Sequence, residues 1–84
     1  MKLWFSEYVR DNITLNYKRY MDYCVEGKTE TECFEKIYAQ YVRPLRYCNG
    51  RIIILADTDV NRRFNDWKMH GVSVSMYYGN GAVD

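Results

Sequence analysis

The spacing of hydrophobic residues changes along the chain, and each spacing predicts a different element. In the first part, apolar and aromatic residues recur about every four positions, as on one face of an amphipathic helix. They are Trp4, Phe5, Tyr8, Val9, Ile13, Tyr17, Tyr20, Met21 and Cys24. We therefore predict a helix here, with a possible break at the poor helix formers Asp11 to Thr14, and an end at Gly27. An edge strand from Leu3 to Val9 is the alternative.

A second helix is predicted directly after Gly27-Lys28. Thr29 followed by Glu32 is a capping-box signature, because the two side chains can satisfy free amides of a first helical turn. The apolar stripe of this helix consists of Cys33, Phe34, Ile37, Tyr38 and Tyr41. Pro44 disfavours helix at the preceding residue and is expected to end the element. Since the link is short, the first two helices are predicted to form an antiparallel helical hairpin.

An unbroken apolar run from Ile52 to Ala56 predicts a strand. A strand with one exposed face would alternate, whereas a continuous run indicates cover on both faces, as in a central strand. The preceding Asn49-Gly50 favours a type I′ turn, because both central residues of that turn need a positive φ. We therefore expect a β-hairpin whose short first arm, Leu45 to Cys48, is a basic edge strand.

The run is followed by a third helical pattern and a second strand pattern. Asp57, Thr58 or Asp59 can cap the helix, and Gly71 is placed to stop it. Its apolar face consists of Val60, Phe64 and Trp67. From Val72 to Tyr78 apolar and polar residues alternate, which indicates a half-buried strand. Strand, helix and strand together predict a right-handed parallel βαβ unit.

These elements predict one compact α+β domain of 84 residues with two layers. Residues 1–42 are its helical part, and residues 43–78 supply the sheet and the crossover helix. The sheet should have about three strands, with the helices mainly on one face. Residues 79–84 show no periodicity and are predicted to be a flexible tail.

Composition narrows the class of protein. Hydrophobic residues make up 48% and charged residues 27% of the chain, which is typical of a globular domain, and the net charge is only +1. We find neither a secretion signal nor an apolar run of membrane-spanning length, so no membrane association is expected. Three cysteines without a close pair favour a reducing compartment, and the expected location is the cytoplasm.

One short motif carries possible chemistry. An apolar strand that ends in Asp57-Thr58-Asp59 resembles the first motif of haloacid dehalogenase-type phosphatases over about seven residues. The resemblance implies a nucleophile at Asp57, a general acid/base at Asp59 and a bound Mg²⁺. The usual Gly-Thr continuation is Val60-Asn61 here. Helix capping explains the same residues without further assumptions, and we favour it.

The cysteines and the single histidine do not predict a metal site. Cys24, Cys33, Cys48 and His70 lack the short paired spacing of zinc ligands, and they carry no local signature of a Cys-His nucleophile pair. Cys24 and Cys33 fall on apolar stripes and are expected in the core. His70 suits the last turn of a helix, where a cation is favourable. We expect no cofactor.

Basic and aromatic residues gather in the second half of the chain. Residues 43–84 hold six basic against four acidic residues. Arg side chains bind phosphates and Tyr rings stack on unpaired bases, whereas both residue types also dominate protein interfaces. The candidate binding residues are Arg43, Arg46, Tyr47, Arg51, Arg62, Arg63, Lys68, Tyr77 and Tyr78.

The leading hypothesis is a small non-enzymatic binding protein that docks on a larger protein, as an inhibitor or regulator. Such small proteins include phage-encoded antagonists of host enzymes such as nucleases or toxins. The alternative is RNA or single-strand binding through the Arg and Tyr residues of the predicted hairpin. A magnesium-dependent phosphate-handling enzyme at Asp57 and Asp59 is the third hypothesis. Exposed aromatic residues and a short edge strand would also allow a homodimer.

Overall fold

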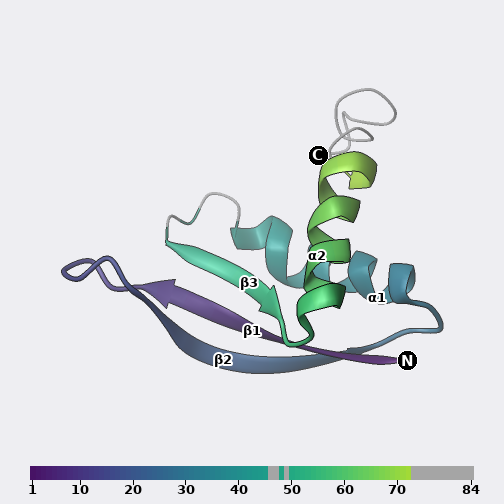
Figure 1. Cartoon of the computed structure of the whole chain (residues 1–84), viewed down its shortest axis with the longest axis horizontal. Coiled ribbons are helices and arrows are strands. Elements are labelled where there is room, and N and C mark those ends of the chain that lie inside the picture. Colours follow the sequence, from purple (N-terminus) through teal and green to yellow (C-terminus); the bar gives the residue numbers. More distant parts are fainter. Residues whose placement is uncertain (46–47, 49, 73–84) are drawn as a thin grey trace.

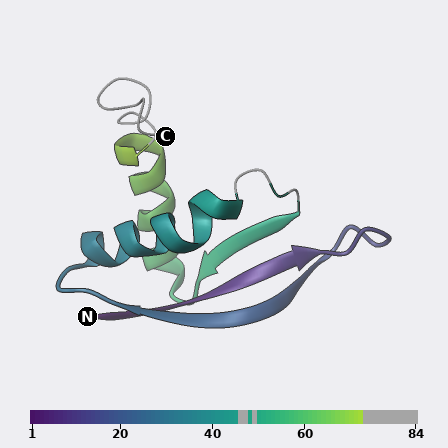
Figure 2. The same ribbon diagram turned by 180° about the vertical axis from the view of Figure 1, so that it is seen from behind.

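The protein is a small two-layer α+β domain, seen here in a computed structural model that describes residues 1–45, 48 and 50–72. Three strands form one layer, and helices lie together on one face of the sheet (Figures 1 and 2). The elements are β1 (Lys2–Arg10), β2 (Tyr17–Glu26), α1 (Glu30–Ile37), η1 (Tyr38–Val42), η2 (Arg43–Leu45), β3 (Arg51–Leu55), α2 (Thr58–Trp67) and η3 (Lys68–Val72). The predicted fold class and the sheet of about three strands are confirmed.

Strand β1 lies in the middle of the sheet, whose order is β2-β1-β3. Both neighbours run antiparallel to it, with Leu3 opposite Val25 on one side and Phe5 opposite Leu55 on the other. The prediction of a helix over the first part of the chain is therefore wrong, and so is the helical hairpin. Leu3 to Val9 does belong to a strand, but this strand is central rather than at an edge.

The four-residue spacing of apolar residues wrongly predicted a helix because aromatic residues lie on both faces of β1. Phe5 and Leu3 face the helices, whereas Trp4 and Tyr8 face the opposite side. Residues from both faces together imitate a four-residue period, although side chains of a strand alternate with a period of two. The turn between the strands is local: Asp11 Oδ1 accepts hydrogen bonds from the amides of Ile13 (2.7 Å) and Thr14 (2.8 Å).

Strand β3 is an edge strand in the described part of the chain. Ile52 and Ile54 are each 37% exposed, so the predicted cover on both faces is wrong there. The predicted hairpin partner is also wrong in its described part, because Leu45 belongs to a 3₁₀ turn and β3 pairs with β1. Gly50 does have the positive φ (+80°) expected of the Asn-Gly turn. Arg46, Tyr47 and Asn49 lie outside the described residues.

Both helix starts are confirmed. The Thr29 side chain accepts from the amide of Glu32 (3.1 Å), and the Glu32 carboxylate accepts from the amide of Lys28. Asp57 Oδ1 accepts from the amides of Asp59 (2.9 Å) and Val60 (3.1 Å). Such caps satisfy amides that have no partner within the helix.

The predicted helix ends need correction. The helical path after α1 continues through η1 and η2 and includes Pro44, because proline is tolerated in a new, short turn. After α2, η3 continues through Gly71 to Val72, so Gly71 does not stop the helix. The predicted strand from Val72 to Tyr78 therefore begins inside η3. The rest of that strand and the predicted flexible tail lie outside the described residues.

One hydrophobic core joins the sheet to the two helices. It consists of Phe5, Val25, Cys33, Phe34, Ile37, Leu55 and Phe64. The rings of Phe34 in α1 and Phe64 in α2 lie 5.2 Å apart, so the two helices contact each other as well as the sheet. Cys33 is buried as expected, and burial raises the pKa of its thiol. Cys24 is exposed on β2, so its prediction as a core residue is wrong.

Candidate binding groove beside strand β3

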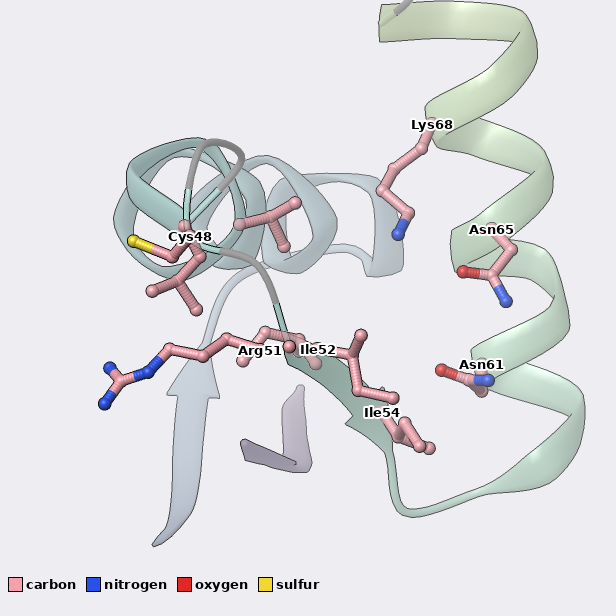
Figure 3. Close-up of a pocket in the computed structure, with 11 residues that line it drawn as sticks. Cys48, Arg51, Ile52, Ile54, Asn61, Asn65 and Lys68 are labelled. Atoms are coloured by element: carbon pink, nitrogen blue, oxygen red, sulfur yellow. The ribbon is translucent and has the colours of Figure 1, made fainter. Parts of the chain in front are cut away.

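A groove runs along the edge of β3 between α2 and the turns η1 and η2 (Figure 3). Its volume is about 580 Å³. We call it the β3 groove, and it is lined by Val42, Leu45, Cys48, Gly50, Arg51, Ile52, Ile53, Ile54, Asn61, Asn65 and Lys68. These residues come from three separate parts of the chain, and two of them, Arg51 and Lys68, were predicted as binding residues.

The main chain of β3 is turned alternately towards β1 and towards the groove. The amide of Ala56 donates to the carbonyl of Trp4 (2.9 Å), so even-numbered residues here bond to β1. The amide of Leu55 donates instead to Asn61 Oδ1 in α2 (2.9 Å), on the opposite side. By the alternation of an antiparallel ladder, the N–H and C=O groups of Arg51 and Ile53 also point away from β1. No strand pairs with them in the described ranges.

The wall opposite β3 is a stripe of three polar side chains on α2 and η3. Asn61, Asn65 and Lys68 are spaced by four and three residues and therefore share one side of the helix. All three side chains point into the β3 groove (Figure 3). Lys68 also lies over the ring of Phe64, at 4.7 Å from its centroid, and burial lowers the pKa of its amine.

The charge of the β3 groove has one sign. Its described lining residues include the cations Arg51 and Lys68, but no aspartate or glutamate. Arg51 forms an ion pair with Glu7 (3.2 Å). Apolar side chains also line the groove, among them Val42, Leu45 and the isoleucines of β3.

Glu7 in β1 anchors Arg51, the first residue of β3, through an ion pair. It is buried on the central strand at 5% exposure, and its other oxygen accepts from the hydroxyl of Tyr23 (3.3 Å). The guanidinium of Arg51 also lies over the ring of Tyr20, at 5.6 Å. A buried carboxylate needs such partners because it has lost its water. This network therefore fixes one end of the β3 edge.

Two of the other predicted basic residues are already paired. Arg62 binds Asp59 (2.7 Å), and Arg63 binds Glu30 in α1 (2.8 Å). Arg43 is exposed in η2, outside the β3 groove. The structure therefore does not gather these arginines with Arg51 into one basic surface. Arg46, Tyr47, Tyr77 and Tyr78 lie outside the described residues.

Asp57 and Asp59 have structural partners. Asp57 caps α2, as favoured from the sequence, and Asp59 holds Arg62. The ranges that the structure covers contain no group of three or more His, Cys, Asp or Glu side chains that could hold a metal ion. They also contain no helix long and apolar enough to cross a membrane.

Sequence analysis missed Asn61, Asn65 and Glu7. The two asparagines lie outside the apolar face predicted for this helix, although their spacing with Lys68 forms a readable stripe. Glu7 was hidden by the wrong helix, because its burial becomes evident only when alternate residues of β1 face the core. Comparison of the chain with protein-family models, curated proteins and solved structures finds no match of any of the three kinds.

Proposed function

We propose that this chain is a non-enzymatic binding protein that docks on a larger protein by adding one of the partner's extended segments to the edge of β3. The observation that carries the proposal is the outward-facing main chain of Arg51 and Ile53 at the floor of the β3 groove. An extended peptide can pair with such an edge through its own main chain, while its side chains enter the adjacent groove. A domain that occupies a partner segment in this way is suited to act as an inhibitor or regulator.

A protein segment fits this site better than a nucleic acid does. An edge strand offers amides and carbonyls in alternation, which match another polypeptide main chain. Phosphate binding calls for several unpaired cations, whereas Arg51, Arg62 and Arg63 each have a carboxylate partner.

The first test selects binders from a displayed library of random peptides against the full chain and follows backbone amide exchange. The amides of Arg51 and Ile53 should exchange fast in the free protein and slowly in the complex. Ile53→Pro removes one outward N–H without removing a bond to β1, so binding should fall at least about tenfold. Ile53→Ala shortens the side chain but keeps the N–H, and is the matched control.

Two results would overturn the proposal. Slow exchange of the Ile53 amide in the free, dilute protein would mean that the chain itself already occupies the edge. Selected peptides that bind Ile53→Pro and Ile53→Ala equally would mean that they use another surface. Thermal melts of both variants establish that each one is folded before binding is compared.

A further inference from the structure

We infer that the face of the sheet without helices carries a second binding site, which takes unpaired bases of a single-stranded nucleic acid at Trp4 and Tyr8. The described helices lie on one face of the sheet (Figure 1), and a hollow of about 390 Å³ lies on the other. We call it the open-face hollow, and its side chains on this face are Trp4, Ser6, Tyr8, Arg19, Asp22 and Ile54. Among the described lining residues it shares only Ile54 with the β3 groove, so this inference does not rest on the proposed function.

Two accessible aromatic rings stand at the ends of the open-face hollow. Trp4, Ser6 and Tyr8 are alternate residues of the central strand, so their side chains point to the same face. Trp4 is 59% exposed and Tyr8 is half-buried, and the small Ser6 leaves space between the two rings. Four residues of a strand span about 13 Å, which is too far for one base to stack on both rings. The spacing therefore suits two bases of one strand.

The polar groups of the open-face hollow favour a nucleobase over an aliphatic side chain. Ser6 Oγ donates to Asp22 Oδ1 (2.5 Å), and Arg19 Nε lies 3.8 Å from the same oxygen. An aliphatic side chain would take water from these groups without replacing its hydrogen bonds, which is costly. A base instead presents its flat face to an aromatic ring and a rim of donors and acceptors to Asp22 and Arg19. The hollow therefore offers both surfaces that an unpaired base uses.

The charges beside Tyr8 can accommodate a phosphate backbone. Arg19 lies directly opposite Tyr8 on β2, and Arg10 follows two residues later on the same face of β1. Both side chains are exposed, and the exposed pair of Arg19 with Asp22 is of a kind that contributes little, so Arg19 can turn to a phosphate. Asp22 limits the number of phosphates that can approach. Stacking on the two rings should therefore carry most of the binding.

The test measures the fluorescence anisotropy of a labelled twelve-nucleotide single-stranded RNA of mixed sequence as the full chain is added at low salt. Trp4→Ala and Tyr8→Ala should each weaken binding at least about tenfold, because each removes one stacking surface. The logarithm of the binding constant should fall against the logarithm of salt concentration with a slope of about −1.4, as expected for two phosphate contacts on a single strand.

Matched variants separate stacking from other effects. Tyr20 is also exposed but lies under the Arg51 guanidinium, outside the open-face hollow, so Tyr20→Ala should bind the RNA like the parent chain. In Trp67→Phe the remaining tryptophan is Trp4, and its fluorescence should be quenched when the RNA binds. Thermal melts of all variants establish that each one is folded before binding is compared.

Four results would overturn this inference. They are no RNA binding at low salt, equal losses of RNA binding in Trp4→Ala and Tyr20→Ala, equal affinity for the duplex of the same sequence, and equal affinity for a mononucleotide. The last result would identify a free nucleotide as the ligand. Absent RNA binding, together with loss of selected-peptide binding in Trp4→Ala, would assign this face to a protein partner instead.

Failure of this inference differs from failure of the proposed function. Ile53→Pro changes the β3 edge and should bind the RNA like the parent chain, whereas Trp4→Ala should keep its binding of peptides that pair with β3. Each site can therefore be refuted while the other is retained.

Discussion

The two edges of the sheet differ in length, charge and cover. Strand β2 forms one edge with ten residues, whereas β3 forms the other with five in the described part of the chain. The charged residues of β2 are Lys18, Arg19, Asp22 and Glu26. Strand β3 has one charged residue, Arg51, followed by Ile-Ile-Ile-Leu. A bulge also interrupts β2, where its pairing with β1 shifts between Glu7 and Tyr8.

This difference is the one expected between a protected edge and an edge available for pairing. Charged side chains and bulges oppose the addition of another strand, because they place charge or twist where a flat neighbour would lie. The β3 edge has few such features and is recessed beside α2 instead. Because the β3 edge is recessed, only a narrow segment can reach it. The charged residues of β2 instead oppose the addition of any strand. The comparison therefore favours β3 as the edge that binds.

The largest expected effect comes from β1, which both edges share. Phe5→Ala should cost about 3–5 kcal/mol of unfolding free energy, because Phe5 is 1% exposed and contacts the core from the central strand. A domain of this size has a comparable total margin, so both edges should be lost together. Urea unfolding followed by circular dichroism measures the change.

The control for Phe5→Ala is the adjacent Trp4→Ala. Trp4 is 59% exposed on the open face, so its replacement should cost far less than that of Phe5. Equal losses for the two variants would contradict the assignment of β1 as an alternating strand with one buried face.

The next largest effect concerns the ion pair between Glu7 and Arg51, which anchors β3. Replacing either partner should lower the free energy of unfolding, but by unequal amounts. Arg51→Met leaves the buried Glu7 without its cation and should cost about 3 kcal/mol. Glu7→Gln leaves Arg51, whose side chain is 40% exposed and can reach water, and should cost only about 1 kcal/mol. Urea midpoints of the two variants measure the asymmetry. A larger loss for Glu7→Gln would show that this pair does not hold the β3 edge as described.

A smaller effect is expected where α2 touches the β3 edge. Asn61→Ala removes the acceptor for the Leu55 amide and should cost about 1 kcal/mol. Amide exchange at Leu55 should become faster than in the parent chain. Asn65→Ala, one turn further along the same wall, should leave Leu55 exchange unchanged. Unchanged Leu55 exchange in Asn61→Ala would refute this contact.

The protection of β2 can be tested by removing its charges. The double variant Lys18→Val, Arg19→Val should change stability by less than about 1 kcal/mol, because both residues are exposed. It should, however, associate with itself in sedimentation velocity, since β-branched residues replace two edge charges. Lys28→Val, Arg43→Val removes two charges outside the sheet and should stay as monomeric as the parent chain. Identical sedimentation of both double variants would mean that these β2 charges do not protect the edge.

The smallest expected effect is a dependence of stability on pH through the contact between α1 and α2. The hydrogen bond from Arg63 holds the pKa of Glu30 below its usual value of 4.5. The pair therefore contributes stability above that value, and the contribution disappears as the pH falls through the lower pKa of the folded state. The parent chain should lose more stability between pH 7 and pH 3 than Arg63→Met. Equal losses in urea titrations would exclude this contribution.

Local sequence determined several parts of this protein by itself. The caps at Thr29 and Asp57 follow from side chains that bond to amides two or three residues away, so neighbouring residues suffice to predict them. Phe64 and the apolar run of β3 were also recognisable, because a helical stripe and a β-branched run are properties of short segments. The α+β class follows from these elements.

Tertiary structure decided where those elements lie and which residues form the groove. Leu3 pairs with Val25 and Phe5 with Leu55, and only these distant partners make β1 a central strand. The same pairing places β3 at an edge, although its isoleucine run alone predicts a centre. Asn61 and Lys68 become groove residues because α2 and η3 lie beside that edge. Pairing between residues far apart in the chain has no local signature, so its consequences, including the β3 groove, were set by the fold.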